Sequence, residues 1–191
     1  QAYKNLGSAR VCLFQFAQAA DAFQKAAQLS PQDVEIQSLW ALSLLDAGRY
    51  AESLALYNKV IRMAPDKVDL HYNRANLHIR FKRYESASAD YLKAYSINPD
   101  IKYLLGDLAN SRVKTCDWQH LADDLERCEK SIRAGELSVQ PFITLALFDL
   151  PELQKQAAQT AVKSEYPEST TLGLMPARST GGKIRVGYYS A

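Results

Sequence analysis

The sequence lacks any run of apolar residues approaching the roughly 20 that a membrane-spanning helix needs, and we expect no signal peptide. Cysteine is scarce as well. The 3 cysteines, an odd number without the spacing of a disulfide framework, indicate reduced thiols. The net charge of +2 over 191 residues leaves no broad footprint for nucleic acid or an anionic membrane surface. These absences predict a globular cytoplasmic protein whose partners are neither nucleic acids nor membranes.

Motifs of catalysis and metal binding are also missing. The sequence has no Gly-x-Ser-x-Gly, no His-Glu-x-x-His, no phosphate-binding loop and no convincing carboxylate pair. His71 and His78 would lie about 10 Å apart along one helix, too far to share a metal ion. Cys116 and Cys128 have no other soft ligand nearby in the sequence. We therefore expect no catalytic residue, no metal ligand and no cofactor within these residues, and a structural role for both histidines.

The sequence does contain a pattern that returns every 34 residues. Prolines, aromatic residues and small residues share this spacing: Pro31, Pro65 and Pro99; Phe23, Tyr57 and Tyr91; Phe16, Tyr50 and Tyr84; Ala19, Ser53 and Ala87. A small residue lets two helices approach closely, an aromatic side chain fills the space to the next unit, and proline ends the second helix. The pattern resembles the tetratricopeptide repeat, a helix–turn–helix unit that stacks on its neighbours.

The landmarks divide the chain into segments. Three repeats would fill residues 1–33, 34–67 and 68–101, and we expect the array to be entered partway at its first residue. Their helices are expected to include residues 17–29, 34–47 and 68–81, with Gly48 as a C-terminal cap. After Pro99 the landmarks stop. Residues 102–165 are predicted to form a non-repeating helical cap over the apolar end of the stack, with a helix from residue 101 to 113, one capped by Asp117 and one beginning at Pro151.

The composition changes near the end of the chain. Residues 166–183 are rich in Pro, Ser, Thr and Gly and are predicted to be a linker. Residues 184–191 are rich in β-branched and aromatic residues, which is typical of the opening strand of an α/β domain. One strand cannot satisfy its own backbone groups, so we expect its partners to lie beyond Ala191. The predicted fold class is an all-α tetratricopeptide-repeat superhelix with non-repeating capping helices, ending in the first strand of a truncated α/β, Rossmann-like domain.

A family resemblance runs along the whole chain. It is carried by the repeats, by Cys-Asp-Trp at residues 116–118, by Pro-Phe at residues 141–142 and by the terminal Lys-Ile-Arg-Val-Gly-Tyr-Tyr-Ser-Ala. Together these resemble the bacterial and plant-type, SPINDLY-like members of the O-linked N-acetylglucosamine transferase family. The resemblance implies a two-lobed glycosyltransferase that moves a sugar from a UDP- or GDP-sugar donor to Ser or Thr of proteins. It also implies that the catalytic residues lie beyond Ala191.

The same resemblance implies a peptide-binding groove. In the family's animal members, asparagines at the sixth position of successive repeats bind the backbone of an extended peptide. That position holds Asn5, Leu39 and Asn73 here, and Asn76 follows one turn later on the same face. An amide side chain has both a donor and an acceptor, so it can pair with any peptide group. The candidate site is thus a concave groove with Asn5, Asn73 and Asn76, interrupted at Leu39; the alternative is that these asparagines are merely exposed helix residues.

Two hypotheses of function follow. In the leading one, the repeats present an acceptor protein to the rest of the chain's own catalytic domain, and residues 1–191 alone are not catalytic. In the alternative, the chain is a non-enzymatic adaptor that holds a peptide or helix of a partner in its concave groove. The sequence leaves open whether the array associates into a homo-oligomer.

Overall fold

The computed structural model describes residues 1–166, and every regular element in that part of the chain is a helix. The helices are α1 (Ala2–Cys12), α2 (Phe16–Leu29), α3 (Val34–Asp46), α4 (Tyr50–Met63), α5 (Val68–Arg80), α6 (Tyr84–Ile97), α7 (Leu104–Thr115), α8 (Trp118–Arg133), α9 (Pro141–Leu147) and α10 (Pro151–Glu165). The predicted all-helical stack is confirmed over these residues. The predicted strand at residues 184–191, and all but the first residue of the predicted linker, lie outside the described residues.

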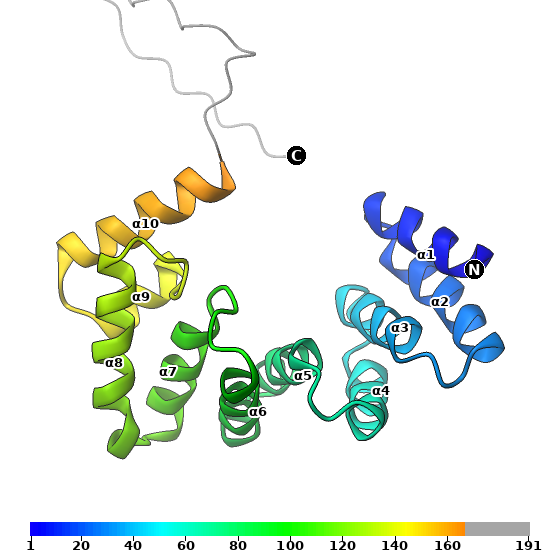
Figure 1. Cartoon of the computed structure of the whole chain (residues 1–191), viewed down its shortest axis with the longest axis horizontal. Coiled ribbons are helices and arrows are strands. Elements are labelled where there is room, and N and C mark those ends of the chain that lie inside the picture. Colours follow the sequence, from blue (N-terminus) through cyan, green and yellow to red (C-terminus); the bar gives the residue numbers. More distant parts are fainter. Residues whose placement is uncertain (167–191) are drawn as a thin grey trace, which may run out of the picture.

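The helices form a curved stack of hairpins (Figure 1). Each helix from α1 to α7 packs on the next one along the chain. Helices α1, α3, α5 and α7 lie on the inside of the resulting arc, and α2, α4, α6 and α8 lie on the outside (Figure 1). At one end α9 packs on α7 and α10, and α10 also packs on α8. None of the helices within residues 1–166 combines the length and the apolar character needed to cross a lipid bilayer.

Small residues let the paired helices approach closely. A Cβ atom placed on Gly7 of α1 would lie 2.7 Å from the ring of Phe23 on α2, so a larger residue there would push the two helices apart. In the next pair the Ser53 hydroxyl donates a hydrogen bond to the Ala41 carbonyl oxygen at 2.7 Å. The predicted small landmarks are all fully buried: Ala19, Ser53 and Ala87. The 34-residue pattern therefore marks the places where helices touch.

The turns within the pairs share one backbone conformation. Four residues at equivalent places in these turns have positive φ angles, from 56° to 76°: Phe14, Gly48, Lys82 and Cys116. Glycine adopts this left-handed conformation without the steric cost that other residues meet. Gly48 was therefore recognisable from the sequence, whereas the other three were not. The 34-residue spacing continues in the backbone through the turn between α7 and α8, beyond the last proline landmark.

Helix α7 begins after Tyr103 and not at residue 101 as predicted. Tyr103 has a φ of 67°, and its N–H donates to the Leu137 carbonyl oxygen at 2.7 Å. In the first turn the N–H of Gly106 donates to the Ser138 carbonyl oxygen at 3.0 Å. A Cβ atom on Gly106 would come within 2.9 Å of the backbone of Val139. The connection between α8 and α9 therefore satisfies N–H groups at the start of α7, and this long-range contact sets where the helix begins.

Asp117 stands at the N-cap position of α8, as predicted, but its side chain makes no hydrogen bond to the helix backbone. Its carboxylate lies 3.2 Å from Nδ1 of His120 and 3.6 Å from Nε of Arg112. These two side chains take the place of the backbone donors. The predicted start of the helix is confirmed, and the predicted side-chain cap is wrong.

Helices α7 to α10 share one hydrophobic core. Burial in it raises the pKa of the Cys128 thiol to about 12, so this cysteine stays protonated. Val162 on α10 is 56% exposed and lies outside this core. The buried members of the cluster are Leu105, Ala109, Leu121, Cys128, Ile132, Val139, Leu153 and Ala157. Helix α8 contributes three of these buried residues, and α10 contributes two.

A buried ion pair joins α7 to α8. Arg112 and Asp124 are 7% and 2% exposed, and the Arg112 guanidinium donates to the Asp124 carboxylate. Nη1 of Arg112 also donates to the His120 carbonyl oxygen at 3.3 Å. Each of the two charges has left water, so each depends on the other for compensation.

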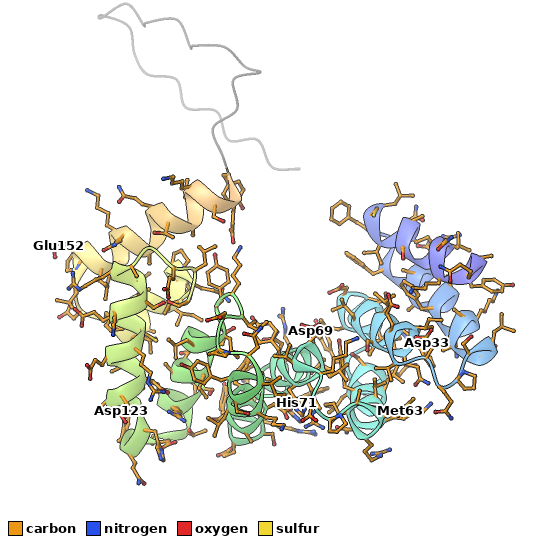
Figure 2. All side chains as sticks on the ribbon, viewed as in Figure 1. Asp33, Met63, Asp69, His71, Asp123 and Glu152 are labelled. Atoms are coloured by element: carbon orange, nitrogen blue, oxygen red, sulfur yellow. The ribbon has the colours of Figure 1, made fainter. Side chains whose placement is uncertain are left out.

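Replacing Asp124 by asparagine should lower the free energy of unfolding by about 3 kcal/mol, because buried Arg112 would keep only the more exposed Asp117 carboxylate, 3.6 Å from its Nε, as a counter-charge. The adjacent Asp123 is exposed on α8 (Figure 2), so Asp123→Asn should change that free energy by less than about 0.5 kcal/mol. Urea unfolding followed by far-ultraviolet circular dichroism measures both. Equal unfolding midpoints for the two variants would contradict the assignment.

Candidate functional site

A pocket of about 480 Å³ opens among the inner helices. Helices α3, α5 and α7 provide most of its wall, and α4, α6 and α9 contribute one residue each. The pocket therefore requires several successive hairpins to be stacked, and no single hairpin contains it. We call it the groove pocket. Its lining residues are Leu45, Asp46, Tyr50, Asn76, Ile79, Arg80, Tyr91, Asp107, Asn110 and Ile143.

Asp107 on α7 is the buried charge of the groove pocket. Its side chain is only 8% exposed, and its Oδ2 accepts a hydrogen bond from the Tyr72 hydroxyl at 2.9 Å. Burial raises the pKa of the Asp107 carboxyl to about 6, while the Tyr72 hydrogen bond acts in the opposite direction. No cation in the described part of the chain offsets the effect of burial. Asp107 is therefore an acid that ionises near neutral pH and has an incomplete set of partners.

The other two charged residues of the groove pocket are exposed. Asp46 on α3 and Arg80 on α5 carry opposite charges. Partial burial raises the pKa of Asp46 as well. Because Asp46 and Arg80 carry opposite charges, together they add no net charge to the solvent-exposed mouth of the pocket. The negative charge of Asp107 is therefore the one that no other pocket residue compensates.

A chain of polar groups fixes the orientation of Asp107. The Tyr91 hydroxyl donates to Oδ1 of Asn76 at 2.6 Å, and Asn76 lies beside the Tyr72 hydroxyl that donates to Asp107. Burial raises the pKa of both tyrosines, so both hydroxyls stay protonated and able to donate. The two tyrosine rings also pack together, with centroids 5.8 Å apart and planes inclined at 54°. Among residues 1–166, no side-chain hydrogen bond uses the amide of Asn110, so this amide is available to a ligand.

The three predicted asparagines have different surroundings. Asn76 lines the groove pocket. Asn73, also on α5, is half-buried and lies near the Tyr57 hydroxyl without a hydrogen bond of good geometry. Asn5 is exposed on α1, toward the other end of the arc, and accepts a hydrogen bond from the Gln1 amide at 3.3 Å. The structure thus brings Asn76, but not Asn5, into the pocket with Asp107. Binding of a peptide by the three asparagines stays a prediction.

Sequence reasoning missed Asp107 and Asn110. Both continue the 34-residue spacing, since Asp107 follows Asn73 and Asn110 follows Asn76 at that interval. The missed signal was a carboxylate in the otherwise apolar run from Leu104 to Ala109, at the place where the repeat pattern demands an inward-facing residue. The prolines had stopped at Pro99, so the spacing was not followed into α7.

A second polar cluster lies between α5 and the outer helices. Arg74 donates to both carboxylate oxygens of Asp90 on α6, at 2.7 and 2.6 Å. His71, labelled on α5 in Figure 2, places Nε2 2.7 Å from the Pro65 carbonyl oxygen and Nδ1 3.5 Å from Asp90. His78 Nε2 is 3.8 Å from Asp90, and burial lowers the pKa of His78. No cluster within residues 1–166 has the ligands for a metal ion. Nδ1 of each histidine is buried without a hydrogen-bond partner in the described residues, and the structural role of both stays a prediction.

A larger hollow of about 670 Å³ lies among the loops that flank α7 and α8. Arg127 and Lys130 at its edge are exposed to solvent. Lys102, a third cation there, is already paired with Glu165 at 2.6 Å. These three cations of the hollow are therefore either exposed to water or paired. The hollow thus lacks a buried, uncompensated charge like that of Asp107 in the groove pocket.

Comparison with known proteins supports a repeat family for part of the chain. The family model described as tetratricopeptide repeat matches residues 38–102. Among solved structures, the crystal structure of MamA protein is 18% identical with a TM-score of 0.61, covering 92% of this chain and 97% of that one. MamA 41-end from Desulfovibrio magneticus RS-1 is 15% identical with a TM-score of 0.64, covering 88% and 96%. At these low identities, the TM-scores show a shared helical fold and nothing more specific. No curated protein matches the sequence.

Asp107→Asn should make the protein more stable at pH 8, because the folded wild type holds an ionised carboxylate in a poorly solvated place while asparagine can still accept the Tyr72 hydrogen bond. The pKa of Asp107 in the folded protein, about 6, lies above its usual value of about 4. Between about pH 4 and 6 the folded protein therefore keeps a proton on Asp107 that the unfolded chain has already released. Wild-type stability therefore rises, relative to the variant, as the pH falls through this range. Denaturant unfolding from pH 4 to 8 measures the difference, which should fade toward pH 4. A variant less stable than the wild type at pH 8 would contradict the assignment.

Proposed function

Starting from the tetratricopeptide repeats of this chain, we propose that it is a protein-binding module that holds an extended segment of a partner protein along the inside of its arc. The observation that carries the proposal is the groove pocket. Within residues 1–166 the half-buried amide of Asn110 has no side-chain partner, and the buried carboxylate of Asp107 beside it has no counter-charge. Groups in this condition gain free energy when a ligand completes their hydrogen bonds.

The chemistry of the pocket suits a peptide. A peptide backbone offers a donor and an acceptor at every residue, and a side-chain amide can pair with both whatever the sequence. An extended segment also exposes these groups, since it has no internal ladder of hydrogen bonds. Asn73 and Asn76 on α5, with Asn110 on α7, place amides on adjacent inner helices, and Leu39 on α3 would form an apolar step.

We favour an adaptor over an enzyme for the described residues. The polar clusters in residues 1–166 are explained by packing or by ligand binding: Arg74 and Asp90 join α5 to α6, and Arg112 and Asp124 join α7 to α8. The fold shared with MamA structures fits a scaffold that presents a surface to partners. The transferase hypothesis rests on the sequence resemblance alone, which is carried by the repeats and by residues 116–118, 141–142 and 183–191.

The two hypotheses differ in one measurable respect. If the adaptor proposal holds, the full-length natural protein will transfer no label from radioactive UDP-N-acetylglucosamine or GDP-fucose to Ser or Thr of an interacting protein. A known protein O-glycosyltransferase serves as the positive control. Transfer that requires the full-length chain would instead support the transferase hypothesis, with the repeats presenting the acceptor.

Peptide binding is tested with Asn110→Ala, which removes the unpartnered amide and leaves the Tyr91, Asn76 and Tyr72 contacts in place. Ten-residue peptides selected from a phage-displayed library on the immobilised protein supply the probe, labelled with fluorescein for anisotropy titration. We expect the variant to bind about 3- to 10-fold more weakly, the effect of one hydrogen bond. Gln28→Ala removes an exposed amide on the outer helix α2 and should leave the affinity unchanged. Failure to select any peptide, or equal binding by both variants, would overturn the proposal.

A further inference from the structure

We propose that the groove pocket takes the side chain of a lysine or arginine from the bound segment, and that its cationic group pairs with Asp107. This inference rests on the proposed function, because a peptide along the inside of the arc is what would deliver the side chain. It adds a chemical specificity that a row of amides does not provide, since amides pair with any peptide backbone.

The distribution of charge in the pocket carries the first part of the argument. The opposite charges of the exposed Asp46 and Arg80 cancel at the mouth, whereas Asp107 is 8% exposed and its negative charge is not compensated. A cation that passes the mouth therefore meets a net negative charge in a place shielded from water, where attraction is stronger than at the surface. An acidic side chain would be repelled there, and a neutral one would leave the carboxylate unpaired.

The lining of the pocket carries the second part. Leu45, Ile79 and Ile143 give apolar surface beside the polar groups, and Tyr50 adds an aromatic ring. Lysine and arginine have long apolar stems that bury along such surfaces while the charged head reaches a polar partner. The volume of about 480 Å³ is ample for one such side chain together with part of the backbone that bears it.

The orientation of the carboxylate carries the third part. Tyr72 donates to Oδ2 of Asp107, and Tyr72 is itself held against Tyr91 and Asn76. In the described residues, Oδ1 accepts no side-chain hydrogen bond and is not among the fully enclosed polar atoms without a partner, so it remains open to the pocket. A carboxylate with one oxygen fixed and the other open is ready to receive an N–H donor of an ammonium or guanidinium group.

The pairing should depend on pH in a defined direction. The titratable and charged groups around Asp107 are Tyr72 on α5, Tyr91 on α6, Tyr50 on α4, and the exposed Asp46 and Arg80; the residue from α9, Ile143, is apolar. Tyr72 and Tyr91 stay neutral through the physiological range, because burial raises their pKa values. Binding of a cation therefore follows the ionisation of Asp107, and affinity should fall as the pH drops from 7.5 to 5.

The test uses a peptide selected on the protein as described above, together with a second peptide in which its basic residue is replaced by glutamine. Kd values are measured by fluorescence anisotropy at pH 7.5 and 5 for the wild type, Asp107→Asn and Asp123→Asn. We expect Asp107→Asn to weaken binding of the basic peptide by about 10- to 100-fold, as for a hydrogen bond to a charged group. The glutamine peptide should bind the wild type and Asp107→Asn equally. The exposed Asp123 on α8 supplies the matched control, and its variant should bind both peptides like the wild type.

The outcomes separate this inference from the proposed function. Selected peptides that lack a basic residue, or a basic peptide whose Kd is unchanged by Asp107→Asn and by pH, would overturn the cation pocket while peptide binding itself stood. Failure to select any peptide would overturn both. Loss of affinity by Asp107→Asn for the glutamine peptide as well would show a general effect on the groove and would also overturn the pairing. Circular dichroism of Asp107→Asn at pH 7.5 confirms that a loss of binding does not reflect unfolding.

Discussion

The close approach of helices across small residues is the constraint on which the rest of the structure depends. Gly7, Ala41, Ala75 and Ala109 are buried at 34-residue intervals on the inner helices. Each allows a neighbouring helix to pack tightly, and tight packing at a fixed spacing gives every hairpin the same register. Other residues at equivalent positions of α1, α3, α5 and α7 therefore face the inside of the arc, where no following helix covers them.

The groove pocket is a consequence of this register. Asp107 and Asn110 on α7 stand where Asn73 and Asn76 stand on α5, so the inner surface continues its polar character into the fourth hairpin. The pocket keeps a carboxylate whose burial raises its pKa to about 6. Groups that destabilise the fold without serving the packing are characteristic of binding surfaces. Burial raises the pKa of Asp124 as well, but that carboxylate has the Arg112 guanidinium as its counter-charge.

Local periodicity allowed the sequence to predict most helices. The predicted landmarks Phe16, Tyr50 and Tyr84 are the first residues of α2, α4 and α6. What the sequence did not reveal depends on distant contacts: the start of α7 follows hydrogen bonds from the α8–α9 connection, and Asp117 turns to Arg112 instead of capping α8. Asn76 was predicted as a site residue, but its place in a network with Tyr91 and Tyr72 required the fold. The predicted strand at residues 184–191 lies outside the described part of the chain and stays a prediction.

The most direct measurement of the central claim is the titration of Asp107 itself, followed through its carboxyl ¹³C chemical shift in labelled protein with the Asp107→Asn spectrum for assignment. The account predicts an apparent pKa near 6 for the free protein and a lower value once a peptide with a basic residue is bound. A pKa near 4 in the free protein, the usual value for an exposed aspartate, would contradict it, as would a value that the basic peptide leaves unchanged.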